Sequence, residues 1–286
     1  MKRCLSCDTC FESSGWTCPT CGHAPSSADG ILTFAPELAP GTGIDADYRF
    51  DALQAAEASH FWFRSRAELI LWAIRRYVPE ARSVLEVGCG SGAVAGAIAN
   101  GLPGVRVTAG EILLEGLRRA KTRFPTVEPI QIDIQRLPFR SEFDLVGAFD
   151  VIEHLDDDRG ALEAMRDVVK PGGAVLITVP QHPSLWSAVD DFSHHRRRYT
   201  RRELAMKLGI AGLSLVRMTS FAFTLLPMMF VSRRLPQKFD AERELRVPAF
   251  ANSLLSGLAT IERRAIAAGL SLPAGGSLLA LALRSS

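Results

Sequence analysis

Short apolar runs alternate with helix-like stretches along most of the chain after residue 80. The runs are rich in Val, Ile, Leu and Ala and predict seven strands, at 83–87, 105–110, 129–133, 143–150, 174–180, 213–218 and 277–282. Stretches at 93–99 and 158–169 predict helices between them. Strands that alternate with helices indicate an α/β fold with a largely parallel sheet.

The last two predicted strands are separated by residues 219–272, where a hairpin would need a loop of about 2–5 residues. The first part, 221–231, is apolar on every face and is followed by Arg233 and Arg234. The second part, 250–268, predicts a helix with one apolar side, formed by Leu254, Leu255, Leu258 and Ile261. Two interpretations stay open. The two helices pack on each other and on the sheet, or they form a lid that shields an apolar acceptor and touches an anionic membrane through 219–235.

Five of the six cysteines lie in the first 21 residues. Two CxxC pairs, Cys4 with Cys7 and Cys18 with Cys21, offer the four soft ligands that a tetrahedral Zn²⁺ prefers. Cys10 and His23 are alternative ligands, and disulfides are the alternative chemistry. We predict a zinc ribbon at 1–35 that folds only with its metal, a linker at 36–45, and a main domain at 46–286. We expect loss of this metal to leave the main domain's ligand affinity almost unchanged.

Charge and hydropathy exclude several classes of protein. Lys and Arg total 33 against 31 acidic residues, a net charge of +2, which argues against a dedicated nucleic-acid binder. The first residues lack the apolar stretch of a secretory signal. The least polar run, 218–232, is interrupted by Pro227 and is shorter than the roughly 18–20 residues that cross a bilayer. The expected location is the cytoplasm, with contact to a membrane surface left open.

A glycine turn follows the first main strand. Gly88, Gly90 and Gly92 lie between the strand at 83–87 and the helix at 93–99, where glycines let the backbone approach a ligand closely. Glu111 ends the second strand, and a carboxylate there can accept hydrogen bonds from ribose hydroxyls. Both features also suit a dinucleotide fold. Glu86 argues against that alternative, because dinucleotide folds usually keep this strand apolar.

The sequence E-x-G-x-G-x-G at 86–92 resembles that of class I S-adenosylmethionine-dependent methyltransferases. This resemblance implies a Rossmann-like seven-stranded sheet with helices on both faces and S-adenosylmethionine as cofactor. It implies that Asp133 and Ile134 meet the adenine ring. Asp150, at the end of the next strand, joins the expected cofactor residues.

Further segments are similar to bacterial methyltransferases of glycan and lipid pathways: WFxxR at 62–66, the stretch from Val179 to Thr200, and PAGGSLLALA at 273–282. Residues 16–34 are similar to zinc ribbons that accompany bacterial methyltransferases. The resemblance implies methyl transfer to a small or lipid-linked acceptor, at oxygen or nitrogen rather than carbon. The alternatives are an RNA methyltransferase that uses its ribbon, a non-catalytic regulator with this fold, and an NAD-dependent oxidoreductase.

The acceptor is expected at the carboxyl ends of the strands, where ligands of open α/β sheets bind. The loop after Pro180 lies there, and its mixed side chains are candidate acceptor contacts: Trp186, Asp190, Arg198 and Tyr199. His154 and His195 are candidates for a general base, since histidine titrates near neutral pH. Two alternatives stay open for His154, a structural role at a helix start and binding of a divalent metal together with Glu153, as in some quinone O-methyltransferases.

Overall fold

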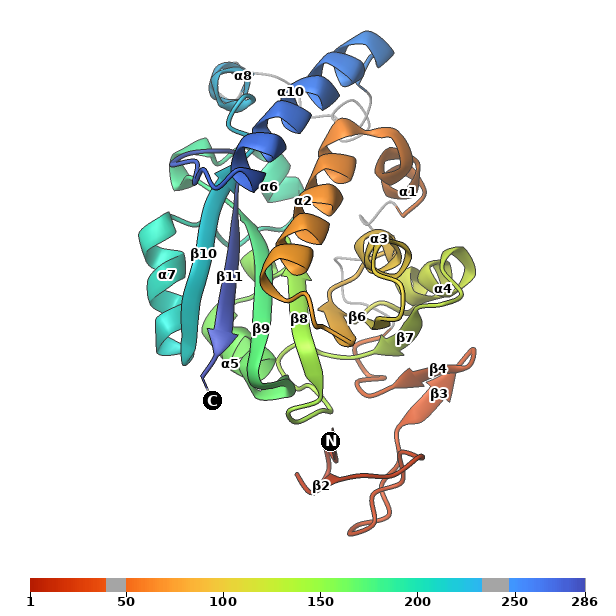
Figure 1. Ribbon diagram of the computed structural model, residues 1–286. Helices are drawn as coiled ribbons and strands as arrows, with labels where there is room; N and C mark the ends of the chain where they lie inside the picture. Colours follow the sequence, from red (N-terminus) through yellow and green to blue (C-terminus); the bar gives the residue numbers. More distant parts are fainter. Residues whose placement is uncertain (40–49, 233–246, 286) are drawn as a thin grey trace.

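The structure, a computed structural model, describes residues 1–39, 50–232 and 247–285 (Figure 1). Its centre is a nine-stranded sheet of order β10-β11-β9-β8-β5-β6-β7-β4-β3. The seven predicted strands are all present, as β5 (Ser83–Val87), β6 (Arg106–Glu111), β7 (Glu128–Gln131), β8 (Phe143–Phe149), β9 (Val169–Pro180), β10 (Leu213–Phe221) and β11 (Ser277–Arg284). Strands β5 to β9 are parallel, while β11 pairs antiparallel with both β9 and β10. The predicted Rossmann-like α/β fold is confirmed.

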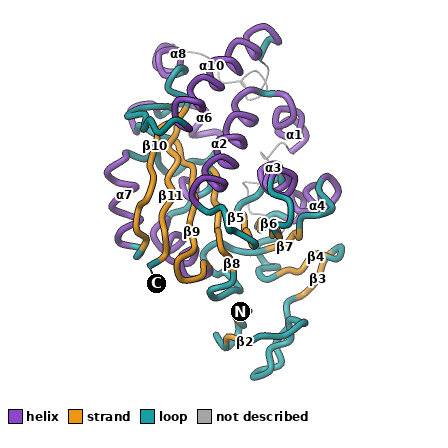
Figure 2. Tube along the Cα trace, viewed as in Figure 1, coloured by secondary structure: helices purple, strands orange, loops and turns teal. Residues whose placement is uncertain are grey.

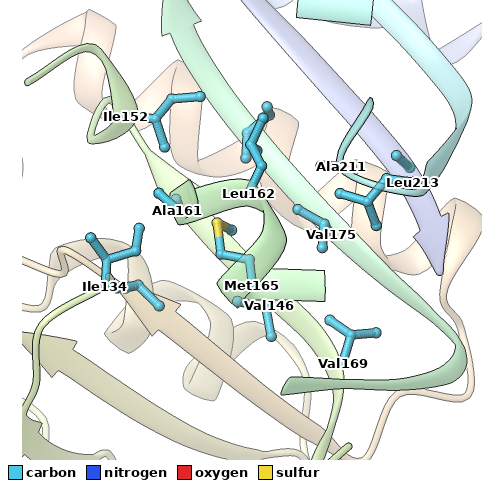
Figure 3. Close-up of a cluster of buried hydrophobic side chains, with 14 of the residues drawn as sticks. Ile134, Val146, Ile152, Ala161, Leu162, Met165, Val169, Val175, Ala211 and Leu213 are labelled. Carbon is cyan, nitrogen blue, oxygen red and sulfur yellow. The ribbon is translucent and has the colours of Figure 1, made fainter. Parts of the chain in front are cut away.

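Helices cover both faces of this sheet (Figure 2). On one face, α2 (Phe61–Tyr77), α3 (Ala93–Gly101) and α4 (Leu114–Arg123) contribute buried apolar side chains, and on the other α5 (Asp158–Val168) and α7 (Arg201–Ile210) do so. Neighbouring residues of a strand point to opposite faces. Leu145 therefore joins the core on the α2 side, and Val146 joins the core on the α5 side. Figure 3 shows the second of these, with Val146 and Met165 of α5. Such two-sided burial explains why β8 and the 174–180 part of β9 are largely apolar.

The remaining helices of the described residues lie beyond the carboxyl ends of the parallel strands (Figure 1). They are α1 (Phe50–Ser59), α6 (Ala188–Phe192), α8 (Leu226–Ser232) and α10 (Ala249–Ala267), with short 3-10 turns at Ile152–His154 and Pro183–Leu185. The α10 helix packs along α2, where the Asn252 side chain accepts a hydrogen bond from Phe61 N at 2.8 Å and donates one to Ser59 O at 3.0 Å. Among the described residues, no helix is long and apolar enough to cross a membrane.

The insertion differs in detail from the sequence expectation. Phe221 belongs to β10, because it pairs with Ser277 of β11, so the first helix starts only at Leu226. On α10, Leu254 and Ile261 are exposed rather than part of one apolar contact face. Arg233, Arg234 and Leu235 lie outside the described residues.

The amino-terminal module is joined to the main sheet. Its first strands, β1 (Lys2–Arg3) and β2 (Cys10–Phe11), form a small antiparallel pair. Its second hairpin, β3 (Ser26–Ala28) and β4 (Ile31–Thr33), extends the large sheet, because β4 pairs in parallel with β7. Residues 26–33, which were expected in a separate ribbon, therefore form strands at the edge of the main sheet. Of the expected linker at 36–45, only residues 36–39 are described.

Candidate functional site

The glycine turn after β5 adopts a backbone that side chains would not allow. Gly88, Gly90 and Gly92 all have positive φ angles, of 73°, 54° and 79°. A Cβ atom on Gly88 would lie 2.5 Å from Val151 Cγ2, and one on Gly92 would lie 2.6 Å from the Cβ of Ala120. Glycine is thus required both by conformation and by close packing. The turn is therefore packed against Val151 and Ala120 at the carboxyl end of the sheet.

Glu111, at the end of β6, points its carboxylate at this turn. Its Oε2 accepts a hydrogen bond from Gly90 N at 2.8 Å, and its Oε1 accepts from Ile112 N at 2.7 Å and Leu113 N at 3.2 Å. The side chain is buried. Backbone donors therefore fix a negative charge between the loops that follow β5 and β6.

Glu86 is a second buried acid, one strand away. Its side chain is 2% exposed, and its Oε2 has no hydrogen-bond partner in the described parts of the chain. Burial raises the pKa of Glu86 to about 8, against a smaller opposite effect of Arg66. The carboxyl is therefore largely protonated at neutral pH, and a cationic ligand group beside it would favour its ionised form.

The loop after β7 brings Asp133 to the same edge. Its Oδ1 accepts a hydrogen bond from Gln135 N at 2.9 Å, and its carbonyl accepts one from Arg136 N at 3.0 Å. Ile134 behaves differently, because its side chain is buried in the core (Figure 3). Only the backbone of Ile134 is therefore available to the site.

Asp150, after β8, holds a helix in place. It has a positive φ of 59°, forms an ion pair with Arg66 of α2, and accepts a hydrogen bond from Thr178 Oγ1 at 3.2 Å. The guanidinium of Arg66 also lies 4.5 Å from the centre of the Trp62 ring. This contact ties α2, which carries the WFxxR sequence, to the end of β8 beside the glycine turn.

A clamp from α1 closes over the same turn, and sequence reasoning missed it. The hydroxyl of Ser91 donates to Glu57, with oxygen distances of 2.8 and 2.6 Å, and Arg123 Nη1 lies 2.7 Å from Glu57 Oε2. Arg123 Nη1 also donates to Ser91 Oγ at 2.6 Å. Neither Glu57 nor Arg123 belongs to a recognisable motif, so no local signal could have found them.

The predicted acceptor loop is built around a buried ion pair. Asp190 is fully buried and accepts two hydrogen bonds from Arg198, from Nε at 2.7 Å and from Nη2 at 3.0 Å. Ser187 N donates to the same carboxylate at 2.9 Å. Burial alone would raise the pKa of Asp190, but hydrogen bonds from His195 and Arg198 hold it well below its usual range. Asp190 and Arg198 therefore shape the loop from inside rather than facing an open mouth.

Tyr199 is also internal, and Trp186 is the exposed member of the four acceptor candidates. The Tyr199 hydroxyl is buried and donates to Asp158 Oδ2 at 2.6 Å. Trp186 is 39% exposed, and its Nε1 donates to Asp191 Oδ1 at 2.9 Å. An acceptor contact is thus compatible with Trp186, whereas burial removes Tyr199 from the surface.

The two candidate bases lie side by side. The rings of His154 and His195 have centres 4.8 Å apart, and both line a hollow of about 280 Å³ together with Asp191, His194 and Arg196. His195 Nδ1 lies 2.9 Å from Asp190 Oδ1. Burial of its ring lowers the pKa of His154 to about 4, so His154 is neutral at physiological pH.

Glu153 sits behind the histidines. It is fully buried, and within the described ranges neither of its carboxylate oxygens has a hydrogen-bond partner. Burial raises the pKa of Glu153 well above its ordinary value, and the charge of Asp150 adds to this effect. One donor atom each from Glu153, His154 and His195 lies within 4.8 Å of the others, so the three could hold a metal ion.

The four cysteines of the amino-terminal pairs converge as well. One donor atom from each of Cys4, Cys7, Cys18 and Cys21 lies within 4.8 Å of the others, with Sγ–Sγ distances of 3.6 Å for Cys4–Cys21 and for Cys7–Cys18. A tetrahedral Zn²⁺ with Zn–S bonds of about 2.3 Å would place its sulfurs about 3.8 Å apart. Cys10 and His23 do not belong to this cluster.

The two cysteine loops are near copies of each other. The carbonyl of Cys4 accepts a hydrogen bond from Asp8 N at 2.9 Å, and the carbonyl of Cys18 accepts one from Gly22 N at 3.0 Å. Asp8 and Gly22, each four residues after the first cysteine of its pair, both have positive φ angles. Paired loops of this kind present their thiols toward a common point.

Comparison with known proteins agrees with the site. Residues 85–177 match the sequence family described as "Methyltransferase domain". This segment of the chain is similar to that family. The matched segment contains Glu86, the glycine turn, Glu111, Asp133 and Glu153.

Relatives of this domain act on different acceptors. The malonyl-acyl-carrier-protein O-methyltransferase of Pseudescherichia vulneris is 32% identical over 149 residues, 50% of this chain and 58% of that protein. The trans-aconitate 2-methyltransferase of Azoarcus sp. is 30% identical over 146 residues, 51% of this chain and 55% of that protein. The chain thus spans a little over half the length of these curated relatives.

A solved structure confirms the fold. Phosphoethanolamine N-methyltransferase 2 of Haemonchus contortus, in complex with S-adenosyl-L-methionine, superposes with a TM-score of 0.58 at 18% identity, over 90% of this chain and 61% of that chain. At this identity the likeness concerns the fold and leaves the acceptor open.

Proposed function

We propose that this protein transfers a methyl group from S-adenosylmethionine to an oxygen or nitrogen of an apolar or lipid-linked acceptor. The observation that carries the proposal is the Glu111 carboxylate, which three backbone N–H groups hold beside the glycine turn. A charge fixed there suits the two hydroxyls of a ribose. The methyltransferase domain match over residues 85–177 supports the same cofactor.

The residues present fit this cofactor along its length. Glu111 would hold the ribose, and the loop that carries Asp133 and the Ile134 backbone would hold the adenine. The buried and partly unpaired carboxyl of Glu86 would face the cationic amino acid end, consistent with its orphaned Oε2. Gly88 and Gly92 allow the positive φ angles with which the turn would follow the cofactor. When bound, the cofactor supplies an electrophilic methyl carbon to an in-line displacement.

The protein's own contribution would be to align the acceptor and to take up its proton. Asp190 is anionic and accepts hydrogen bonds only, so its contact favours the tautomer of His195 with the proton on Nδ1. In that tautomer Nε2 carries the free lone pair that can accept a proton. Since His195 lines the hollow next to His154, we assign it the role of general base for an acceptor hydroxyl.

A divalent metal is a second candidate for the same hollow. The observation in its favour is the buried Glu153 carboxylate without a partner, close to the donor atoms of His154 and His195. Two imidazoles and one carboxylate are a donor set that Zn²⁺, Mn²⁺ and Fe²⁺ accept. A chelator that leaves the metal of the cysteine ribbon in place distinguishes the two candidates. If methylation activity survives it, His195 acts as a base without a metal in the hollow.

The acceptor class is inferred from the surface around the site. Large apolar side chains are exposed on α8, on α10 and in the loop at 181–200: Trp186, Phe192, Met228, Phe230, Phe250 and Leu254. These elements lie at the carboxyl end of the sheet (Figure 1). Apolar surface at the rim of a site is typical of binding to apolar ligands or to membranes. An apolar or lipid-linked acceptor, which the protein would reach at a membrane surface through 219–235, would explain why these apolar side chains are exposed beside the site.

The amino-terminal cysteines are proposed to bind a structural Zn²⁺. Their donor atoms have the spacing that tetrahedral thiolate coordination requires. Hydrogen bonds with Thr9 lower the pKa of Cys7 to about 6, so a thiolate is accessible at this ligand.

The test of the proposal is incubation of the full-length protein with S-adenosylmethionine carrying a labelled methyl group. Total lipid extract and a water-soluble extract of bacterial cells serve as separate acceptor pools. Label that moves into the lipid pool supports the whole proposal, whereas label found only in small polar products refutes the acceptor class. Absence of transfer to either pool, together with absence of cofactor binding, would refute the reaction.

A further inference from the structure

The amino-terminal module, residues 1–35, contacts the main domain beside the proposed adenosine site. Strand β4 lies along β7, with Leu32 opposite Ile130 and Thr33 opposite Gln131 (Figure 1). The chain leaves β7 directly into the loop that carries Asp133. The module therefore borders one of the two loops on which the proposed cofactor binding depends.

A buried amide connects the module to the other loop. Gln131 is fully buried; its Oε1 accepts a hydrogen bond from Ala35 N at 2.9 Å, and its Nε2 donates to Ala35 O at 2.7 Å. The same Nε2 donates to Ile112 O at 3.2 Å. Ile112 N in turn donates to Glu111 Oε1. The Gln131 side chain thus joins Ala35 to the backbone of Ile112, which orients the Glu111 carboxylate.

The first residues of the chain hold the far part of the Asp133 loop. Arg3 N donates to Pro138 O at 2.9 Å, and Arg140 N donates to Met1 O at 2.9 Å. The guanidinium of Arg136 donates to the carbonyl of Leu5, the residue next to Cys4. The loop is thereby attached directly to the segment that supplies the first cysteine.

The part of the module that carries the cysteines, residues 1–23, has a very small buried core of its own. Its own buried apolar cluster consists of Cys4, Phe11 and Cys18, of which two are proposed metal ligands. Trp16 extends it outward, with its ring centre 4.6 Å from that of Phe34 and 5.6 Å from that of Phe139. A segment this small needs a metal for stability, so its order depends on the metal being bound.

We propose that metal bound by the four cysteines sets the affinity of the cofactor site, because it orders the module that positions the Glu111 and Asp133 loops. This inference rests on the proposed cofactor binding and on the proposed zinc site. It replaces the expectation that loss of the metal leaves ligand affinity unchanged. Coupling between two sites is reciprocal, so a bound cofactor must raise the affinity for the metal by the same factor.

The test is calorimetric titration of the full-length protein with S-adenosylhomocysteine in three states: zinc-loaded, zinc-stripped with a chelator, and reloaded. Stripping should weaken binding by at least about tenfold, within the usual range of coupling between sites, and reloading should restore it. Cys18→Ser should weaken binding to a similar extent. Its matched control is Cys10→Ser, an exposed cysteine outside the four-sulfur cluster, which should bind like the unaltered protein.

Hydrogen exchange shows where the effect acts. Zinc removal should speed exchange at 128–140 and 111–113 while β9, β10 and β11 stay protected. Equal affinity with and without zinc overturns the inference, and so does loss of protection across the whole sheet, because the metal would then support folding in general. Zinc-loaded protein that fails to bind S-adenosylhomocysteine refutes the proposed function itself, and a chain that takes up no zinc refutes the metal site.

Discussion

Asp190 Oδ1 lies 2.9 Å from Nδ1 of His195 while Arg198 donates two hydrogen bonds to the same carboxylate. The acid is fully buried, so it is fixed by its partners and keeps its charge. This arrangement orients one imidazole toward the hollow that it shares with His154. Asp190 and Arg198 were predicted to contact the acceptor. In the structure they instead hold His195, the predicted base, in position.

Replacing the base should reduce turnover without weakening cofactor binding. His195→Gln should lower kcat by about 10²–10⁴-fold, the usual contribution of general base catalysis. Affinity for S-adenosylhomocysteine should stay within twofold of the original, since His195 is not among the proposed cofactor residues. The measurement is a steady-state methylation assay together with calorimetry. An unchanged kcat would exclude His195 as the base.

Removing the Glu111 carboxylate, which is proposed to bind the ribose, should lower the affinity for the cofactor. Glu111→Ala should reduce affinity for S-adenosylhomocysteine by about 1–3 kcal/mol, through loss of charge-assisted hydrogen bonds. Glu115→Ala is the matched control, because this acid is exposed on α4 and pairs with Arg119. Equal affinities of the two variants in calorimetry would show that Glu111 does not bind the ribose.

Glu86 predicts a proton release on cofactor binding. Its pKa of about 8 means that the free protein holds a proton there at pH 7. A cationic amino group beside it would lower that pKa and expel the proton. Calorimetry at pH 7 in buffers of different ionisation enthalpy should show close to one proton released, and none for Glu86→Gln. Equal proton release by both proteins would contradict the assignment.

The same group gives a stability trend with a definite sign. Because the folded pKa of Glu86 is raised from 4.5 to about 8, the folded state binds more protons than the unfolded state between these values. Its contribution to stability is therefore fully present below about pH 4.5 and is lost as the pH rises through about 8. Denaturant unfolding of Glu86→Gln should lack this decline, when compared with the unaltered protein over the same pH range.

The apolar rim should bind membranes. Phe250 is 83% exposed on α10, and Phe250→Asp should reduce co-sedimentation with vesicles that contain anionic lipid. Met206→Asp is the control, since Met206 is an exposed apolar residue on α7, outside the insertion. If Arg233 and Arg234 meet the headgroups, changing both to Glu should have a similar effect. If neither Phe250→Asp nor the double Glu variant reduces vesicle binding, the exposed apolar side chains at the rim are not the membrane contact.

Local patterns were enough to predict the strands and to place the glycine turn and Glu111 at their carboxyl ends. The apolar runs at 83–87 and 143–150 are recognisable because both faces of a parallel strand are buried, and Glu111 follows from its position at a strand end. The clamp of Glu57, Ser91 and Arg123 was not predictable, because it joins residues that are distant in sequence and that follow no periodicity. The place of β4 on the edge of the main sheet was hidden for the same reason.

Burial of polar side chains was the other feature that sequence reasoning could not supply. Asp190, Arg198 and Tyr199 are polar residues in a loop, which suggests exposure at a binding mouth. In the structure Arg198 pairs with Asp190 and the Tyr199 hydroxyl donates to Asp158, and these contacts offset the cost of burying the polar groups. A sequence indicates which groups are charged, but only the fold shows which charges meet.

The central claim is that the loops at the carboxyl ends of β5, β6 and β7 bind S-adenosylmethionine. Calorimetric titration of the zinc-loaded, full-length protein with S-adenosylhomocysteine tests it directly, with NADH titrated in parallel. The account predicts one site per chain with micromolar affinity, about −7 to −8 kcal/mol, and no saturable binding of NADH. Tight binding of NADH without binding of S-adenosylhomocysteine would contradict it.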